Sequence, residues 1–320
     1  MVRRSVLDDH LLGTARGLGV EVMTATRAAG ATAGPDGVTV IDGAGNRYGG
    51  QALVCADGVN GPSRSWFDLP HGGTRNLLLQ ADIEVAAGED PTGGALAIDF
   101  SPIRLGLPGY AWFFPSVDVQ GNRVINAGIT GGSFKRGEAG RMKGVFEEVL
   151  RLYHPEMGTP ARPLRYRPYP ERCLAFRQPF SAPRVLFVGE QLGVDPLTGE
   201  GLGVCADSAR VASLEIRGAI ESGDFSFGGY RRKMLGTGSF PLWVAGRAFS
   251  ELRTPRRFAA LLSLITEECT GDEESFLNLY SRAFSGTLPP RALLTRGTLA
   301  VINAAARKPA RYCGFPRRTG

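Results

Sequence analysis

The chain has 320 residues, enough for two modest domains or one large one. With 43% hydrophobic and 21% charged residues, its ordinary globular composition excludes a disordered or collagen-like protein. No uncharged run approaches the roughly 18 residues of a membrane-spanning helix. Because no apolar run follows Arg3 and Arg4 as in a secretory signal, we expect a cytoplasmic protein.

The formal net charge of +6 is unevenly distributed. Residues 1–224 carry 22 basic and 25 acidic side chains, whereas residues 225–320 carry 15 and 6, a net charge of +9. This basic region is suited to an anionic membrane surface, although a solvated helical surface explains it equally well. Nothing resembles a nucleic-acid-binding module, so nucleic acid is not an expected partner.

Cysteine and histidine are sparse and scattered. The five cysteines never show C-x-x-C spacing, and none of the three histidines lies near another or near a nucleophile pattern. These observations predict free thiols, no metal site and no hydrolytic triad. We therefore expect any chemistry to depend on a cofactor.

The N-terminal part is predicted to form a helix followed by short strands. Apolar residues at helical spacing predict a helix over residues 7–18, and residues 20–23 are predicted to be a strand. A glycine-rich turn between residues 38–41 and 47–53 favours a hairpin. Residues 52–56 form a continuous apolar run, which is typical of a strand covered on both faces.

The remainder is predicted to contain an antiparallel sheet and then helices. Alternating apolar residues predict strands over residues 77–85, 96–100, 110–114 and 123–129. A short buried strand at 184–189 precedes a helix at 201–220, and apolar residues after 225 recur mostly at helical spacing.

Two segments follow predicted buried strands and carry ligand-binding features. Asp57-Gly58 would place a carboxylate and backbone N–H groups at the edge of a sheet, although Asp-Gly is also a common turn. In residues 184–203 a strand ends in Glu190, a loop of turn residues follows, and a helix begins with small residues. Glycines allow a planar ligand to approach the backbone, and the helix N-terminus attracts negative charge, which suits a reduced flavin.

These segments resemble those of the geranylgeranyl reductase family of FAD-dependent oxidoreductases, within the larger group similar to para-hydroxybenzoate hydroxylase. Between them, residues 109–115 look like the family's Y-x-W-x-F-P substrate-cavity motif, and residues 126–128 match the strand after it. Order and spacing agree over residues 3–220.

The resemblance implies α/β plus α+β architecture. Residues 1–78 and 183–224 would form an incomplete Rossmann-like FAD-binding domain, and residues 79–182 an inserted antiparallel β-sheet substrate domain. Residues 225–320 would form a basic helical C-terminal region.

The resemblance also implies roles for particular residues. Glu190 would hold the flavin-side ribose, and Asp57 and Gly58 would support the pyrophosphate. Contacts to the isoalloxazine ring are expected from Pro196, Gly199, Gly201 and Leu202. The cavity for an isoprenoid chain would be lined by Tyr110, Trp112 and Phe114, although alternate aromatic residues on a strand are usually just core.

The implied activity is hydride transfer from reduced flavin to a carbon–carbon double bond of an isoprenoid chain on a lipid, quinone or pigment. NADPH or ferredoxin would be the external electron donor, and the protein would lie peripherally at the inner face of the membrane. No catalytic residue is assigned, because Tyr110, water or a group outside the sequence could equally deliver the proton.

Two departures from the family pattern stand out. The usual Gly-Asp-Ala-Ala is Gly189-Glu190-Gln191-Leu192, so the carboxylate is one methylene longer and two small residues are large. No G-x-G-x-x-G occurs anywhere in the chain. We therefore expect an N-terminally truncated sequence that lacks at least one βαβ unit and exposes apolar surface on the strands of Val54 and Leu186.

Two alternatives remain open. A flavin-dependent monooxygenase or halogenase would carry a similar W-x-W-x-I-P motif, although residues 195–201 favour the reductase and no lysine lies inside the motifs. The other alternative is an inactive fragment that binds no FAD.

Overall fold

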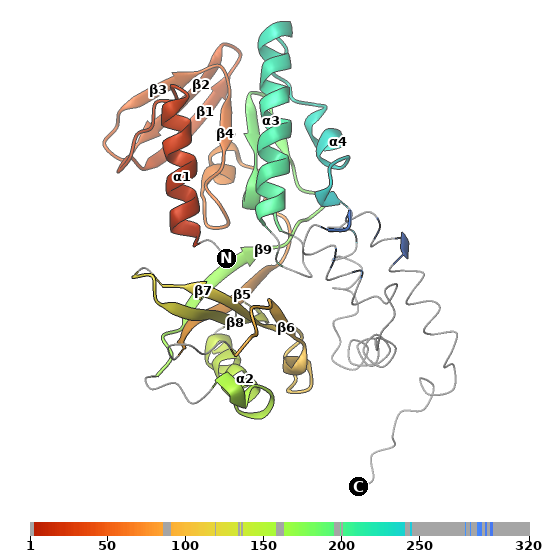
Figure 1. The fold of residues 1–320 in the computed structure, drawn as a ribbon. Coiled ribbons are helices and arrows are strands. Elements are labelled where there is room, and N and C mark those ends of the chain that lie inside the picture. Colours follow the sequence, from red (N-terminus) through yellow and green to blue (C-terminus); the bar gives the residue numbers. More distant parts are fainter. Residues whose placement is uncertain are drawn as a thin grey trace. The chain divides into compact units, whose positions relative to one another are not determined.

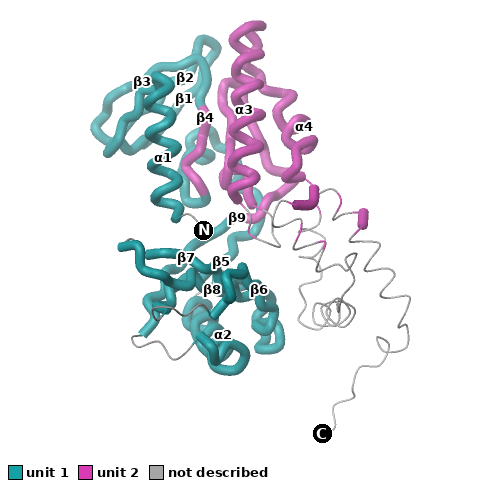
Figure 2. The backbone as a smooth tube through the Cα atoms, viewed as in Figure 1, with its two compact units in different colours: residues 1–53, 59–171 teal, residues 54–58, 172–320 magenta. Residues whose placement is uncertain are grey.

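The structure is a computed structural model of the 320-residue chain. It describes residues 3–85, 91–118, 120–133, 135, 137–157, 163–194, 199, 201–240, 244, 279, 282, 287–289, 292 and 295–296. The chain divides into two compact units (Figure 2). Unit 1 comprises Met1–Leu53 and Val59–Glu171, and unit 2 comprises Val54–Gly58 and Arg172–Gly320.

Unit 1 begins with a helix and a small sheet (Figure 1). Helix α1 (Arg4–Gly17) buries none of its side chains. Strands β1 (Ala28–Gly34), β2 (Gly37–Asp42) and β3 (Arg47–Gly50) pair antiparallel in the order β1-β2-β3. The predicted helix and hairpin are therefore confirmed.

The predicted strand at residues 20–23 is wrong. This segment has no strand structure, and Val20 and Met23 are exposed. Apolar residues favour a strand only where a sheet face is available to bury them. Strand β1 was not predicted, because its Ala- and Gly-rich sequence lacks large alternating apolar residues.

A five-stranded sheet, in the order β6-β7-β8-β5-β9, forms the larger part of unit 1. Its members are β5 (Arg75–Glu84), β6 (Ala97–Asp99), β7 (Ala111–Val117), β8 (Arg123–Ser133) and β9 (Arg167–Arg172). The pairs β5–β8, β6–β7 and β7–β8 are antiparallel. The predicted antiparallel sheet is confirmed, whereas β9, which contains two prolines, was not predicted.

Helix α2 (Glu138–Tyr153) lies against one face of this sheet (Figure 1). Its apolar side chains join those of the strands in one core, where the Phe113 and Phe146 rings stack with centroids 6.0 Å apart. Both phenylalanines are fully buried. This packing fixes which side chains of each strand face α2.

Unit 2 holds a three-stranded sheet in the order β10-β11-β4, formed by β4 (Leu53–Cys55), β10 (Ser181–Ala182) and β11 (Val185–Phe187). The helices α3 (Leu202–Ser222) and α4 (Tyr230–Met234) follow. The Tyr230 hydroxyl donates a 2.9 Å hydrogen bond to the Phe187 carbonyl and thereby ties α4 to β11. The predicted buried strand and helix are confirmed.

The central position of β11 corrects one expectation. Leu186 is fully buried because β11 lies between β10 and β4, so the expected exposure of this strand is wrong. Val54 on β4 is 40% exposed, which contradicts the prediction of a strand covered on both faces.

The fold class is confirmed as mixed α/β with antiparallel sheets. The domain boundaries at residues 78, 182 and 224 remain a prediction. Most of the basic region after residue 240 lies outside the described residues. In the part of the chain that the structure describes, no helix has both the length and the apolarity needed to cross a membrane.

Candidate cofactor and substrate sites

Unit 2 brings together three of the residues predicted to bind the cofactor. Asp57 and Gly58 follow β4, and Glu190 lies in the short 3-10 helix η4 (Gly189–Gln191) after β11. The two loops are adjacent because Val188 N–H donates to the Cys55 carbonyl at 3.1 Å. A Cβ built on Gly58 would lie 3.6 Å from Glu190 Oε2.

A buried glutamine joins these loops. Gln191 Nε2 donates to Asp57 Oδ1 and to the Gly58 carbonyl, both at 2.8 Å. Gln191 and Leu192 are 1% and 0% exposed, so the two residues that replace the family's alanines lie in the interior of unit 2. The sequence analysis noted Gln191 only as a difference from the family pattern and did not predict its hydrogen bonds to the Asp57 loop. The one indication of these bonds in the sequence is a polar residue close to the end of an apolar strand.

Gly58 has a conformation that favours glycine. Its φ is +72°, in the left-handed region that residues with a side chain rarely adopt. Asp57 is exposed, and Gly58 and Glu190 are half-buried, so all three are accessible at the surface of unit 2. The two loops thus present backbone groups and two carboxylates to a ligand.

The predicted ring-contacting residues are described in part. Pro196 lies outside the described residues. Gly199 has a φ of +69°, Gly201 caps the N-terminus of α3, and Leu202 begins the helix with its side chain 48% exposed. An exposed leucine beside the positive end of the α3 helix dipole suits an apolar ring that carries negative charge at one edge.

The two carboxylates fit the ribose of FAD better than its pyrophosphate. Carboxylates only accept hydrogen bonds, so Asp57 and Glu190 suit the hydroxyl groups of a ribose. Their negative charges oppose direct contact with a pyrophosphate, whereas a backbone donor such as the Gly58 N–H suits it. Among the described residues, no group of three His, Cys, Asp or Glu side chains could hold a metal ion.

Unit 1 brings the predicted aromatic residues onto one face of the sheet. Tyr110 directly precedes β7, and its ring contacts that of Trp112 edge-on with centroids 6.4 Å apart. Tyr110 and Trp112 are 9% and 8% exposed, and Phe114 is half-buried. Because successive residues of a strand alternate, Trp112 and Phe114 lie opposite the face on which Phe113 packs with α2.

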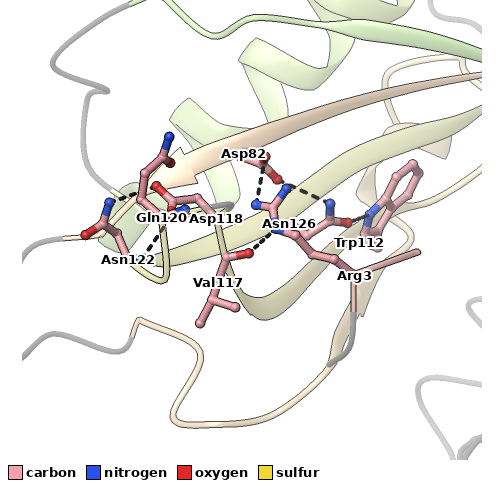
Figure 3. Close-up of polar contacts among 8 residues, drawn as sticks. All are labelled: Arg3, Asp82, Trp112, Val117, Asp118, Gln120, Asn122 and Asn126. Carbon is pink, nitrogen blue, oxygen red and sulfur yellow. Dashed lines mark hydrogen bonds and ion pairs between the residues drawn. The ribbon is translucent and has the colours of Figure 1, made fainter. Parts of the chain in front are cut away.

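Trp112 is held by two neighbours on strand β8. A Cβ built on Gly128 would lie 2.3 Å from Cζ2 of Trp112, so the indole occupies the space above this glycine. The Trp112 indole N–H donates to Asn126 Oδ1 at 3.1 Å (Figure 3). The sequence predicted residues 126–128 only as the strand after the aromatic motif, and their contact with Trp112 was missed.

Comparisons with known proteins identify the fold. The chain matches no family model and no curated protein. Among solved structures it is similar to a geranylgeranyl bacteriochlorophyll reductase-like protein from Thermoplasma acidophilum, with a TM-score of 0.63, 19% identity, and coverage of 97% of this chain and 73% of that one. The predicted resemblance is confirmed at the level of the fold.

Two further structures place this fold among FAD-containing proteins. A variant of the halogenase PltM in complex with FAD has a TM-score of 0.53 and 15% identity, over 96% of this chain and 74% of that one. HpxO of Klebsiella pneumoniae, complexed with FAD and uric acid, has a TM-score of 0.54 and 14% identity, over 94% and 72%. The chain has the fold of these flavoproteins.

Proposed function

We propose that the protein is an FAD-dependent oxidoreductase that reduces carbon–carbon double bonds of an isoprenoid chain on a lipid, quinone or pigment. The observation that carries this proposal is the convergence of Asp57, Gly58 and Glu190 after two adjacent strands, in a fold shared with FAD-containing proteins. The reductase-like neighbour and the aromatic wall of Tyr110, Trp112 and Phe114 favour an isoprenoid substrate.

The roles of the residues follow from their chemistry. Glu190 and Asp57 would accept hydrogen bonds from ribose hydroxyls, and Gln191 would hold Asp57 in place. The bound flavin would supply a hydride for the double bond. Apolar and aromatic side chains exclude water and suit a hydrocarbon chain better than a charged substrate. Tyr110, the wall residue with a hydroxyl, or water would deliver the proton to the neighbouring carbon.

FAD titration of the 320-residue protein tests the cofactor assignment. Hydrogen bonds to charged groups contribute about 1.5–3 kcal/mol, so we expect Glu190→Gln to weaken FAD binding by about tenfold or more. Asp36→Asn, which changes an exposed carboxylate in the β1–β2 turn, is the matched control and should bind FAD normally. Wild-type protein that binds no FAD would instead support an inactive fragment.

A flavin-dependent monooxygenase or halogenase is the second candidate function, because PltM and HpxO share the fold. Turnover that requires oxygen, or oxygen and chloride, would favour this candidate. Anaerobic reduction of a double bond would favour the reductase.

We also propose an external electron donor, NADPH or ferredoxin, and contact of the basic region 225–320 with an anionic membrane. The net charge of +9 in this region supports the contact. We expect the protein to sediment with phosphatidylserine vesicles at low salt and to be released at high salt. Sedimentation that depends on neither salt nor lipid charge would contradict the membrane proposal.

A further inference from the structure

A row of hydrogen bonds crosses the sheet of unit 1 and ends at Trp112 (Figure 3). Arg3 donates to Asp82 Oδ2 on β5 at 3.3 Å. Asn126 on β8, which is paired in register with Asp82, donates through Nδ2 to Asp82 Oδ1, also at 3.3 Å. Asn126 Oδ1 then accepts the Trp112 indole N–H at 3.1 Å. Four side chains thus form one connected relay.

The chemistry of the two ends fixes the direction of the amide between them. The Asp82 carboxylate can only accept, and the Trp112 indole N–H can only donate. A flipped Asn126 amide would direct its oxygen at the carboxylate and its N–H₂ at the indole, which would break both bonds. The carboxylate therefore orients the amide, and the amide in turn orients the indole.

Arg3 anchors this relay at the other end. Its side chain is 20% exposed and that of Asp82 is 23% exposed, so the ion pair is largely covered. Arg3 Nε also donates to the carbonyl of Val117 at the end of β7. The guanidinium therefore joins β5 and β7, the two strands on either side of β8. It also holds Asp82 through directional N–H donors.

We propose that Arg3, Asp82 and Asn126 are positioning residues that hold the Trp112 indole in one orientation, with its N–H hidden from ligands. The indole then presents an apolar surface, which selects a hydrocarbon chain over a ligand that needs a hydrogen-bond donor. The selectivity rests on the proposed function, since it treats Trp112 as a wall for the substrate. The relay itself does not depend on that function.

The indole N–H provides a direct readout in the ¹⁵N-labelled 320-residue protein without FAD or substrate. The chain has three tryptophans, and the ¹H–¹⁵N indole cross-peak that disappears in Trp112→Phe assigns the signal. We expect Asn126→Leu to shift this cross-peak upfield, because the hydrogen-bond acceptor is lost. We expect Arg3→Met to shift or split it, and Arg3→Lys to cause a smaller change.

A matched control lies one residue away. Arg4 forms an exposed pair with Asp8 on the surface of α1, so Arg4→Met should leave the Trp112 cross-peak unchanged. An unchanged cross-peak in folded Arg3→Met would overturn the proposal that Arg3 positions Trp112. If Arg3→Met does not fold, Asp82→Asn replaces it at nearly constant volume, and an unchanged cross-peak there would overturn the proposal equally.

A binding measurement separates this inference from the proposed function. With geranylgeraniol in detergent micelles as the probe, we expect Asn126→Leu to weaken binding several-fold and Arg4→Met to leave it unchanged. A shifted cross-peak with unchanged probe binding would overturn the selectivity role but confirm the relay. Failure of FAD binding would overturn the proposed function and leave the cross-peak result intact.

Discussion

The two faces of the five-stranded sheet in unit 1 are built from the same strands but differ in kind. On the α2 face, the side chains of Phe113, Ala127 and Ile129 are fully buried in an apolar core. On the opposite face, Trp112 and Asn126 from the same two strands take part in a hydrogen-bonded relay. One face is suited to stability, and the other combines aromatic surface with polar groups that orient it.

Because side chains alternate between the two faces of a strand, adjacent residues can serve different purposes, one the stability of the core and the other the binding of a ligand. Phe113 and Phe114 are neighbours in β7, yet Phe113 is fully buried against α2 and Phe114 is half-buried on the other face. Substitutions at adjacent positions should therefore affect different properties.

The largest effect is expected from Phe113→Ala. Truncation of this buried ring leaves a cavity beside Phe146 and should lower the free energy of unfolding by about 3–5 kcal/mol. Phe114→Ala should cost much less, because its ring is half-exposed, but should weaken binding of geranylgeraniol. Urea unfolding of both variants measures the comparison, and equal losses of stability would contradict the assignment of the two faces.

A smaller effect is expected from Gly128→Ala. The new methyl group would lie 2.3 Å from the Leu79 carbonyl oxygen and from the Trp112 ring. Overpacking of this kind costs about 1–3 kcal/mol, and the indole should move. Gly49→Ala is the control, because a Cβ there meets nothing within 4 Å. Thermal unfolding and the assigned indole ¹H–¹⁵N cross-peak of Trp112 report the two effects, and an unperturbed variant would show that the indole does not rest on Gly128.

The smallest effect is expected from pH, at the edge of the α2 face. His154 follows α2 and contacts Phe113, with ring centroids 4.2 Å apart. Its Nε2 lies 3.0 Å from Asp99 Oδ2 on β6, and its Nδ1 lies 2.9 Å from Glu156 Oε1. The hydrogen bond with Asp99 raises the pKa of His154 against the opposing effect of burial, with Glu156 contributing in the same direction.

The sign of the pH dependence follows from both partners. Burial opposes ionisation of Asp99, but hydrogen bonds with His154 and Ser101 outweigh it and lower the pKa of Asp99. The contribution of His154 to stability is complete below its unfolded pKa of about 6.5 and is lost as pH rises through its folded pKa. That of Asp99 is complete above its unfolded pKa of about 3.9 and is lost as pH falls through its folded value.

The pair should therefore stabilise the fold most between about pH 4 and 6.5. Urea unfolding at pH 6 and at pH 8.5 should show a smaller stability difference between the two pH values in His154→Gln than in wild type. An identical pH profile in the two proteins would exclude a contribution of His154.

The strands and helices that could be predicted from the sequence are those marked by a regular spacing of apolar residues within a short segment. Alternation identified the four strands between residues 77 and 129, because a half-buried strand repeats every two residues. The same rule failed at Val20 and Met23, where no sheet face is available. Local pattern thus predicts the tendency to form a strand, whereas tertiary packing decides the outcome.

The sequence predicted which residues belong to the candidate site, but it did not predict the hydrogen bonds that these residues form. The motifs pointed to Asp57 and Glu190, which lie close together in unit 2. The partners that orient the predicted residues were missed, since Gln191 is 134 residues from Asp57 and Arg3 is 79 residues from Asp82. Hydrogen bonds over such separations leave no periodic signal in a single sequence.

One anaerobic single-turnover measurement tests the central claim most directly. The protein is loaded with FAD, the flavin is reduced with dithionite, and geranylgeraniol in detergent micelles is added under argon. We predict that the flavin absorbance returns and that the product gains two hydrogen atoms for each double bond reduced. A flavin that stays reduced until oxygen is admitted, with geranylgeraniol unchanged, would contradict the account.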